Sequence, residues 1–405
     1  MKFGILKERK SPPDKRVVFP PQKIAELKKR FPAAEIVVEA SDIRIFNDNE
    51  YKAAGIQVTD NLADCDVLIG VKEVPAGELI AGKKYFFFSH TIKKQPHNQK
   101  MLQSILDNDI TLYDHETVTD ALGKRLIGFG RYAGIVGTYN AFRAFCLKYD
   151  LYDLPKAEKL NGIDVIIERL RKLYLPPIKI VLTGRGKVGM GAKEILDSIK
   201  IKQVSPEDFL TKNYDRPVYT QIDVLDYNRR MDGEAPLGNV EFYTSPGSFE
   251  SDFAKYANVA DIFIAGHFHA NSAPDILTNQ MLADAKCRLK VVADISCDVD
   301  GPIACTVRSS TIAEPLYGYH PVTRQEVDMH HPEAIVVMAV DNLPCEIPRD
   351  ASEGFGEMFL KHVIPAFYDH DANGILQRAM ITEHGKLAQG FKYLNGYVKE
   401  NVPHI

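Results

Sequence analysis

A glycine-rich turn near the middle of the chain constrains the fold more than any other sequence feature. The apolar run IKIVLT over 178–183 is followed by glycines in G-x-G-x-x-G spacing, and then by the helix-forming run KEILDSI. Glycines let such a turn tighten around a pyrophosphate, whose charge the free amides at the start of the helix attract. An ordinary strand-to-helix turn is the competing interpretation. The order of strand, turn and helix favours dinucleotide binding, with these predicted contacts: Gly184, Arg185, Gly186, Lys187, Val188 and Gly189.

The residue that distinguishes NAD from NADP is ambiguous in the sequence. An acidic residue about 20 positions after the turn normally holds the adenosine ribose of NAD. The next strand, over 201–204, ends at Ser205, which together with the acids after it also has the pattern of a helix N-cap. A second strand, over 218–223, ends at Asp223 but lies late for this spacing. Ser205 and Asp223 are both candidate cofactor contacts, and the cofactor is NAD or NADP.

Strands and helices alternate along most of the chain. Short β-branched or aromatic runs over 34–39, 67–71 and 84–89 each precede a plausible helix, which is typical of a parallel sheet with crossover helices. The glycine turn begins a second pattern of this kind, and 405 residues are enough for two cores. We predict an α/β fold of two doubly wound Rossmann-like domains with a cleft between them. The substrate domain is expected at 1–130 with 342–405, and the dinucleotide-binding domain at 131–341.

Two further segments shape this domain organisation. Helical periodicity over 132–149 is long enough to bridge two domains, and the main boundary is placed near it. The segment from Tyr214 to Ser251 is rich in turn formers and charge, so we expect an insertion within the nucleotide domain.

Composition excludes several classes of protein. With 50 basic and 54 acidic residues the net charge is -4, so no sequence-wide field exists to hold nucleic acid or an anionic membrane. Six cysteines without C-x-x-C spacing fit reduced thiols better than disulfides or zinc. Neither a signal-peptide pattern nor an apolar segment of membrane-spanning length is present. We therefore expect a soluble cytoplasmic protein, monomeric or homo-oligomeric, that acts on small molecules.

Several sequence blocks resemble a known family. LIGVKEVP, FFFSHTIKKQ and VVADISCD are similar to alanine dehydrogenase and transhydrogenase, whereas LYDHE, GFGRYAG and VDNLPCEIPRDAS favour the lysine-forming saccharopine dehydrogenases, including the lysine-ketoglutarate reductase part of bifunctional enzymes. This resemblance implies an NAD(P)-dependent oxidoreductase that interconverts saccharopine with lysine and 2-oxoglutarate. At 405 residues we expect a stand-alone reductase. An enzyme acting on pyruvate and ammonia is the first alternative, and a non-catalytic dinucleotide-binding regulator is the second.

The resemblance also indicates which residues move protons. Lys72 and His90 match the paired acid-base residues of the family, and both follow strands at the carboxyl end, where parallel sheets bind ligands. Histidine titrates near neutral pH, and a desolvated lysine beside other cations can do so too. Glu116 in LYDHE resembles a family glutamate that pairs with the catalytic lysine and tunes it. By position alone, Lys72 could be a solvated lysine at a strand end, His90 a histidine that caps a strand, and Glu116 a solvated acid at the start of a helix.

Substrate contacts are expected from guanidinium groups, because saccharopine carries three carboxylates and a guanidinium binds a carboxylate in a bidentate manner. Arg16 matches a substrate arginine of the superfamily, and Arg125 and Arg131 bracket the GFG turn. Arg125 and Arg131 are also interpretable as surface charges. Asp341 matches a family aspartate near the active site, although an Asx turn explains it equally well.

Two more residues are predicted cofactor contacts. Asp298 aligns with the pocket aspartate of alanine dehydrogenase, and His267 follows the strand DIFIAG, where it would line the nicotinamide side of the cleft. His267 and His269, like His330 and His331, could be taken for a metal pair. No third ligand is evident in the sequence near either pair, so no metal is predicted.

Overall fold

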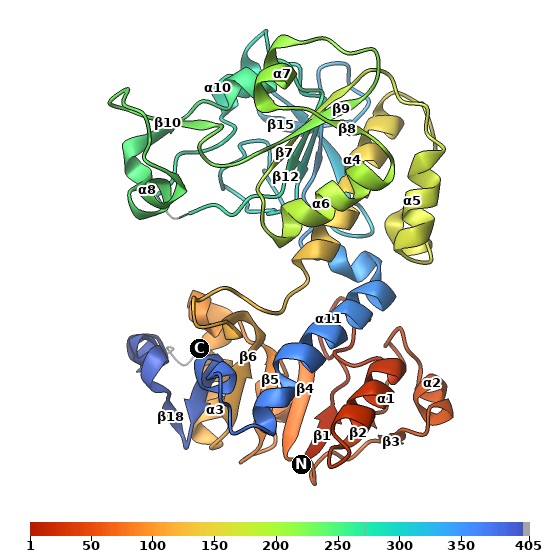
Figure 1. The fold of residues 1–405 in the computed structure, drawn as a ribbon, viewed down its shortest axis with the longest axis vertical. Coiled ribbons are helices and arrows are strands. Elements are labelled where there is room, and N and C mark those ends of the chain that lie inside the picture. The colour runs from red at the N-terminus through yellow and green to blue at the C-terminus, as the bar shows by residue number, and fades with distance from the viewer. Residues whose placement is uncertain (271, 400–405) are drawn as a thin grey trace. The chain divides into compact units, whose positions relative to one another are not determined.

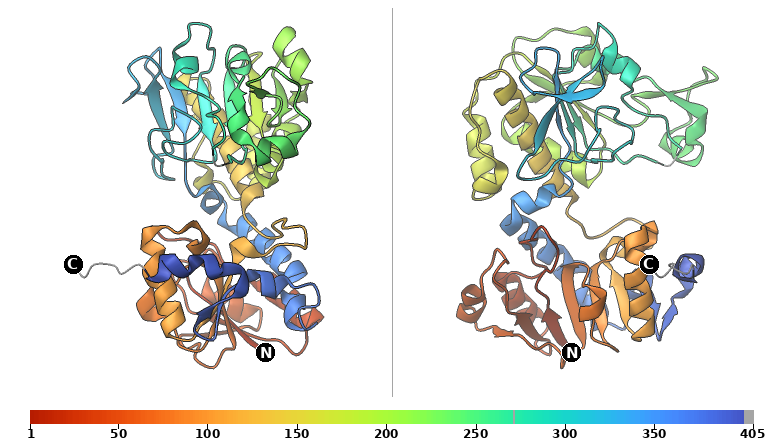
Figure 2. Two further views of the ribbon diagram at one scale, coloured as in Figure 1. Left: turned by 90° about the vertical axis from the view of Figure 1, so that its left-hand side faces the viewer. Right: turned by 180° about the vertical axis from the view of Figure 1, so that it is seen from behind.

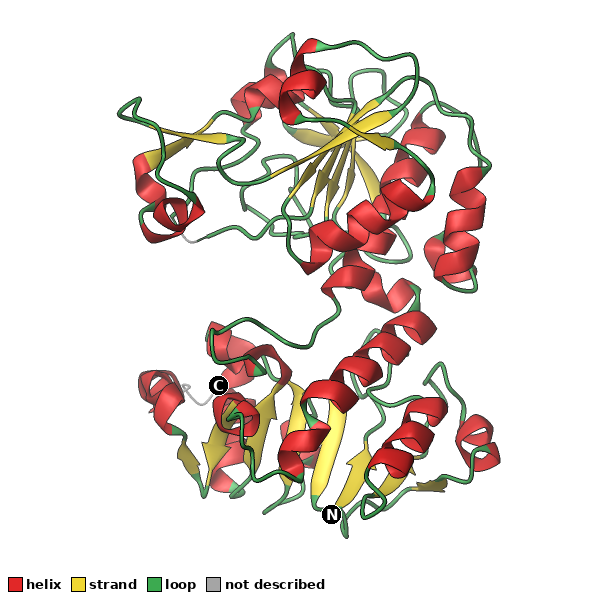
Figure 3. Cartoon of the chain, viewed as in Figure 1, coloured by secondary structure: helices red, strands yellow, loops and turns green. Residues whose placement is uncertain are grey.

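The computed structural model describes residues 1–270 and 272–399. Contacts between residues divide the chain into two compact units: unit 1 holds Met1–Phe129 with the described residues from Pro348 onward, and unit 2 holds Gly130–Ile347. Each unit is a largely parallel sheet with helices on both faces (Figures 1 and 3). The predicted α/β fold with two Rossmann-like domains is therefore confirmed. Residues 400–405, which we expected in the substrate domain, lie outside the described residues.

Unit 1 is built on an eight-stranded sheet in the order β18-β17-β6-β5-β4-β1-β2-β3. The first six strands of the chain pair in parallel, whereas β17 pairs antiparallel to β6 and β18 antiparallel to β17. Many of the strand residues are β-branched or aromatic, which suits a buried pleated surface. The strands are β1 Lys2–Ile5, β2 Glu35–Glu39, β3 Gln57–Thr59, β4 Val67–Lys72, β5 Lys84–Phe88, β6 Thr111–Asp114, β17 Met380–Glu383 and β18 Lys386–Leu387.

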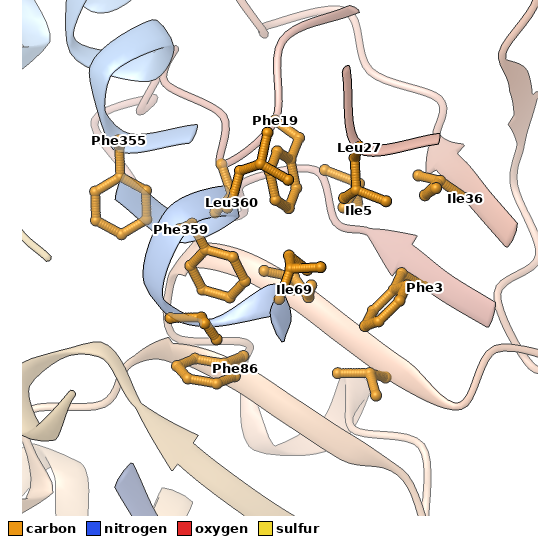
Figure 4. Packing of buried hydrophobic residues seen from close by; sticks show 14 of the residues in the cluster. Phe3, Ile5, Phe19, Leu27, Ile36, Ile69, Phe86, Phe355, Phe359 and Leu360 are labelled. Carbon is orange, nitrogen blue, oxygen red and sulfur yellow. The ribbon is translucent and has the colours of Figure 1, made fainter. Parts of the chain in front are cut away.

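Alternate residues of these strands enter two hydrophobic cores, because successive side chains of a strand point to opposite faces. Ile69 and Phe86 lie in the first core, while Leu68 and Phe87 of the same strands lie in the second. Figure 4 shows the first core, where Phe359 packs edge-on against Phe86 with ring centroids 5.1 Å apart. Both faces of the sheet are thus buried, as parallel sheets require.

Helices from both ends of the chain cover this sheet (Figure 2). α1, α2, α11 and α12 contribute buried residues to the first core, and α3 contributes to the second. The chain returns to unit 1 because α11 carries an apolar face that the first core buries. The helices are α1 Pro21–Arg30, α2 Asp48–Ala53, α3 Pro96–Asp107, α11 Pro348–His362, α12 Ile375–Ala379 and α13 Asn395–Lys399.

Unit 2 contains a second eight-stranded sheet, in the order β15-β14-β16-β13-β12-β7-β9-β8. From β16 to β8 all neighbours are parallel, and β14 and β15 add an antiparallel edge. The strand order reverses between β7 and β12, which is where open α/β sheets bind their ligands. The strands are β7 Lys179–Thr183, β8 Lys202–Gln203, β9 Val218–Ile222, β12 Ile262–Ala265, β13 Val291–Asp294, β14 Leu316–His320, β15 Gln325–Val327 and β16 Ile335–Met338.

Two helices of unit 2 meet at backbone distance. A Cβ added to Gly134 of α4 would lie 2.0 Å from the carbonyl oxygen of Val188, and one added to Gly191 of α6 would lie 2.0 Å from that of Arg131. Glycine at both positions therefore allows an approach that no other residue permits. The helices of this unit are α4 Gly130–Lys148, α5 Ile163–Arg171, α6 Lys187–Ser198, α7 Pro206–Thr211, α8 Asn239–Thr244, α9 Ala254–Ala257 and α10 Asn279–Ala283.

α4 lies within unit 2 for its whole length and contacts β12, β13 and β16. Most of its 19 residues are buried, as expected for a helix that is apolar on all sides. Within the described part of the chain, no helix has both the length and the apolar character needed to cross a membrane.

The segment from Tyr214 to Ser251 is not simply the insertion that its composition predicted. It begins with β9, a fully buried strand that pairs with β7 in the middle of the sheet. Only the remainder leaves the sheet, as the two-stranded ribbon of β10 (Asn228–Arg230) and β11 (Phe249–Ser251) with α8 between them. The strand predicted over 218–223 is thus part of the sheet, and only the residues after it form an insertion.

Candidate active site

Three predicted residues of unit 1 lie at the carboxyl ends of adjacent strands. Lys72 is the last residue of β4 and pairs with Phe88, the last residue of β5. His90 follows two residues later, and Glu116 lies in the 3-10 turn that follows β6. Because these strands are neighbours and parallel, their ends share one edge of the sheet, where ligands of such sheets bind.

Lys72 is a half-buried amine surrounded by charge. Burial lowers its pKa below the ordinary value of 10.5, and the positive charges of Arg16 and Lys10 lower it further, although Asp14 and Glu73 oppose this. A lysine with a lowered pKa can exchange protons closer to neutral pH than a solvated one. Its environment therefore suits an acid-base role.

Arg16 is fixed by a carboxylate that the sequence analysis did not single out. Its Nε and Nη2 donate to the two oxygens of Asp14, at 3.0 and 2.6 Å, and both residues are almost completely buried. Burial opposes ionisation of Asp14, but the charge and hydrogen bonds of Arg16 outweigh it and hold the pKa of Asp14 at about 2. The guanidinium also lies 4.2 Å from the ring centre of Phe129. Arg16 is therefore a rigid, charged group near Lys72.

Glu116 contacts His90 rather than its expected partner Lys72. Its Oε2 lies 3.1 Å from Nδ1 of His90, and its Oε1 accepts from Arg125 at 2.9 Å and lies 3.6 Å from Nζ of Lys93. Burial opposes ionisation of Glu116, but these three groups outweigh it and hold its pKa at about 2. The β6 turn thus directs Glu116 towards His90, and the expected tuning of Lys72 by Glu116 stays a prediction.

A buried hydrogen-bond network around Asp114 connects the residues next to His90 and Glu116. Asp114, the last residue of β6, accepts from the hydroxyl of Ser89 and, at 2.7 Å, from the amide of Glu116. Burial raises the pKa of Asp114 to about 6 despite these bonds. His90 itself has a left-handed backbone, with φ of 54°, so the chain turns sharply after Ser89. Asp114 thus ties together the two turns that carry His90 and Glu116.

The glycine turn of unit 2 has the geometry that a dinucleotide site requires. Gly184 has φ of +89°, and a Cβ there would lie 2.5 Å from the carbonyl oxygen of Gly266, so only glycine fits. A Cβ on Gly189 would lie 2.1 Å from the carbonyl oxygen of Gly184. A Cβ on Gly186 meets nothing within 4 Å. Gly184 and Gly189 therefore allow the backbone of the turn to pack tightly. Gly186 leaves open space at the start of α6, where a pyrophosphate binds in this motif.

The structure brings Asp223, but not Ser205, next to this turn. β9 pairs directly with β7, and its last carbonyl, of Ile222, accepts from the amide of Gly184 at 2.9 Å. Asp223 follows immediately, and its carboxylate accepts from Asn239 and from the amide of Val224, both at 2.9 Å. Ser205 instead follows the edge strand β8 and caps α7 through the amide of Asp208. Asp223 thus occupies the strand end where an acid holds the ribose.

The other predicted residues of unit 2 differ in their surroundings. His267 is buried, with Nδ1 2.8 Å from Oγ1 of Thr183, while its buried Nε2 has no partner among the described residues. Burial and nearby His269 lower the pKa of His267 to about 3, so it is neutral at physiological pH. Asp298 and Asp341 are exposed beyond the carboxyl ends of β13 and β16. Arg131 binds both carboxylate oxygens of Glu194 on α6, at 2.7 and 2.6 Å.

A histidine cluster lies elsewhere in unit 2. His320, His331 and Glu333 could bring three ligand atoms together. However, Nδ1 of His320 accepts from the amides of Val322 and Thr323, both at 3.2 Å, which places its proton on Nε2, 3.0 Å from Glu333. A protonated Nε2 has no lone pair for a metal. The hydrogen bond to Glu333 accounts for this arrangement.

Two family models match the chain: the alanine dehydrogenase/PNT N-terminal domain over residues 4–136 and the alanine dehydrogenase/PNT C-terminal domain over residues 175–400. Alpha-aminoadipic semialdehyde synthase of Arabidopsis thaliana is 27% identical over 98% of this chain, which spans 42% of that protein. The saccharopine dehydrogenase [NAD(+), L-lysine-forming] of Yarrowia lipolytica is 24% identical over 82% of this chain and 83% of its own length.

Solved structures show the same fold. An L-alanine dehydrogenase superposes with a TM-score of 0.64 at 16% identity, covering 98% of this chain and 100% of that one. The chain spans less than half of the semialdehyde synthase noted above and the full length of this alanine dehydrogenase.

The ion pairs of Glu116 predict a pH-dependent contribution to stability. Because its pKa of about 2 lies below the ordinary 4.5, the contribution is complete above pH 4.5 and is lost as the pH falls through 2. Glu116→Gln should therefore lower the free energy of unfolding by roughly 1–3 kcal/mol at pH 7, and by less at pH 3, in urea titrations. Glu383→Gln, an exposed control in the same unit, should show no difference at either pH. Equal losses for Glu116→Gln at both pH values would contradict the ion-pair account.

Proposed function

Because the chain belongs to the alanine dehydrogenase/PNT family, we propose that it is a nicotinamide-dependent oxidoreductase that interconverts saccharopine with lysine and 2-oxoglutarate. The ε-amine of lysine and the ketone of 2-oxoglutarate would form an imine with loss of water, and the imine would then be reduced. The matches to a saccharopine dehydrogenase and to semialdehyde synthases support this choice of substrates.

The observation that carries this proposal is the concentration of positive charge on unit 1. Cationic side chains surround the strand ends of β4 and β5, and they are Lys10, Arg16, Lys72, Lys93 and Arg125. Three carboxylates, of Asp14, Glu73 and Glu116, neutralise only part of this charge. Saccharopine brings three carboxylates, whereas pyruvate brings one. The excess of cations fits the larger, more acidic substrate better.

Lys72 and His90 are the proposed acid-base pair. Formation of the imine requires a proton to leave the attacking amine and another to reach the departing hydroxyl, and two positioned groups can serve both needs. The lowered pKa of Lys72 lets its neutral form accept a proton. Contact with Glu116 fixes the orientation of the His90 ring through Nδ1, which leaves Nε2 as the nitrogen that faces other groups.

The proposed cofactor is NAD, held by the glycine turn. The fit rests on the open space at Gly186 and on the buried Nε2 of His267, which has no partner in the described part of the chain and is free to hydrogen-bond to a bound dinucleotide. When bound, the nicotinamide supplies the hydride that reduces the imine. Asp223 supports NAD over NADP because a strand-end carboxylate accepts from a ribose hydroxyl and repels a 2′-phosphate.

A substrate panel tests the proposed function. NADH oxidation should be rapid with lysine plus 2-oxoglutarate and slow with pyruvate plus ammonia, because the cationic site matches the former. Initial rates at saturating NADH measure this directly. Activity with pyruvate and ammonia alone would replace the proposal with an alanine dehydrogenase-like reaction.

The acid-base pair is tested separately. Lys72→Met and His90→Gln should each lower turnover by about 10²–10⁴-fold, which is the usual contribution of general acid-base catalysis. Binding of NADH, measured by fluorescence, should survive in both variants. Lys100→Met and His97→Gln, on exposed positions of α3, provide matched controls that should keep full turnover. Near-wild-type rates for both site variants would remove the pair from the mechanism.

Cofactor preference is the third test. Asp223→Asn should reduce the ratio of NADH to NADPH affinity by roughly 10- to 100-fold, the value of a hydrogen bond to a charged group. Ser205→Ala should leave the ratio unchanged, since Ser205 caps α7. Gly186→Val should abolish binding of both cofactors while the protein stays folded, because its side chain would fill the open space. A ratio that is the same in Asp223→Asn and the wild type would argue against the assignment.

A further inference from the structure

At the end of β4, the side chain of Glu8 binds backbone amides where the neighbouring strand β1 no longer pairs with β4. β1 pairs with β4 only as far as Ile5, opposite Ile69, and the amide of Leu6 makes the last backbone bond, to the carbonyl of Ile69 at 2.9 Å. β4 continues to Lys72 without this neighbour. There the two carboxyl oxygens of Glu8 accept from the amides of Val71 and Lys72, at 2.7 and 2.8 Å.

This contact depends on a local irregularity. The register between β4 and β5 shifts between Ile69 and Lys72, which marks a bulge. In a regular strand successive amides point in opposite directions, so one carboxylate can reach both only where the strand is distorted. Bulges near active sites often redirect a side chain. Glu8 thus holds the backbone of Lys72 in the distorted form.

Burying the Glu8 carboxyl is energetically unfavourable, so its position must be stabilised by specific hydrogen bonds. The residue is only 7% exposed, and its pKa is raised to about 8 by burial and by Asp14, against the hydrogen bonds from Val71 and Lys72 and the charge of Arg16. A carboxyl group in such surroundings destabilises the fold unless its hydrogen bonds compensate. Both compensating donors belong to the end of β4.

We infer that Glu8 is a positioning residue for Lys72, whose backbone it clamps so that the amine stays beside Arg16 and Asp14. This inference rests on the proposed function only in assigning Lys72 a catalytic role. The amide of a glutamine at position 8 could accept from one of the two backbone amides but would oppose the other with its own N–H groups. Lys72 would then move towards solvent.

The test compares Glu8→Gln and Glu8→Asp with the wild type. The titration of the Lys72 amine can be measured without any substrate, as the pH dependence of its acylation by acetic anhydride, quantified by mass spectrometry. In both variants this titration should move to higher pH, because a more solvated amine has a pKa closer to the ordinary value. Turnover with lysine and 2-oxoglutarate should fall roughly 10- to 100-fold with its pH profile shifted, while NADH affinity stays the same.

Tyr51→Phe is the matched control for a loss of stability. Its hydroxyl donates to the carbonyl of Phe19 at 2.9 Å, so this variant also loses a buried side-chain hydrogen bond to the backbone of unit 1, but away from β4. It should leave the Lys72 titration and turnover unchanged. A folded Glu8→Gln or Glu8→Asp protein with the wild-type titration would overturn the inference, and so would an equal shift in Tyr51→Phe. An inactive wild type whose Lys72 titration still shifts in the Glu8 variants would instead contradict the proposed function and support the clamp.

Discussion

Parallel strand pairing is the constraint on which the rest of this structure depends. Parallel neighbours need crossover connections, which bury both faces of each sheet and bring all the carboxyl strand ends to one edge. The cores formed around Phe86 in unit 1 and Phe263 in unit 2 satisfy the first requirement. The second places Lys72 with His90 on one sheet, and the glycine turn with Asp223 and His267 on the other. The location of each candidate site therefore follows from the sheet topology. The chemistry of each site follows from the residues at the carboxyl ends of its strands.

Burial decides the protonation state of the groups at these edges. Asp14 and Glu116 stay ionised because cations face them, whereas burial keeps His115 and His267 neutral. At Lys72, the cations beside the amine act in the same direction as burial, and both lower its pKa. A site with this charge distribution can bind carboxylates and also holds an amine whose pKa is lowered. The two properties come from the same cluster of residues.

The sequence predicted the fold class and the family resemblance, and both are confirmed. Alternating strands and a glycine motif are local signals, which a single sequence carries. Contacts between distant residues are not local, so the pairing of Glu116 with His90 instead of Lys72 was missed. The clamp by Glu8 joins residues 63 and 64 positions apart and left no sequence signal. Asp223 was predicted as a candidate in spite of its late spacing, and strand order, rather than spacing, places it beside the glycine turn.

In the proposed reaction, a nicotinamide hydride reduces an imine formed from lysine and 2-oxoglutarate. Transfer of deuterium from the cofactor to the product follows this step. The protein is incubated with NADH deuterated at the transferable C4 position, lysine and 2-oxoglutarate, and the products are analysed by mass spectrometry. We expect saccharopine carrying one deuterium at the carbon that was the ketone of 2-oxoglutarate. Consumption of NADH without labelled saccharopine, or labelled glutamate in its place, would contradict it.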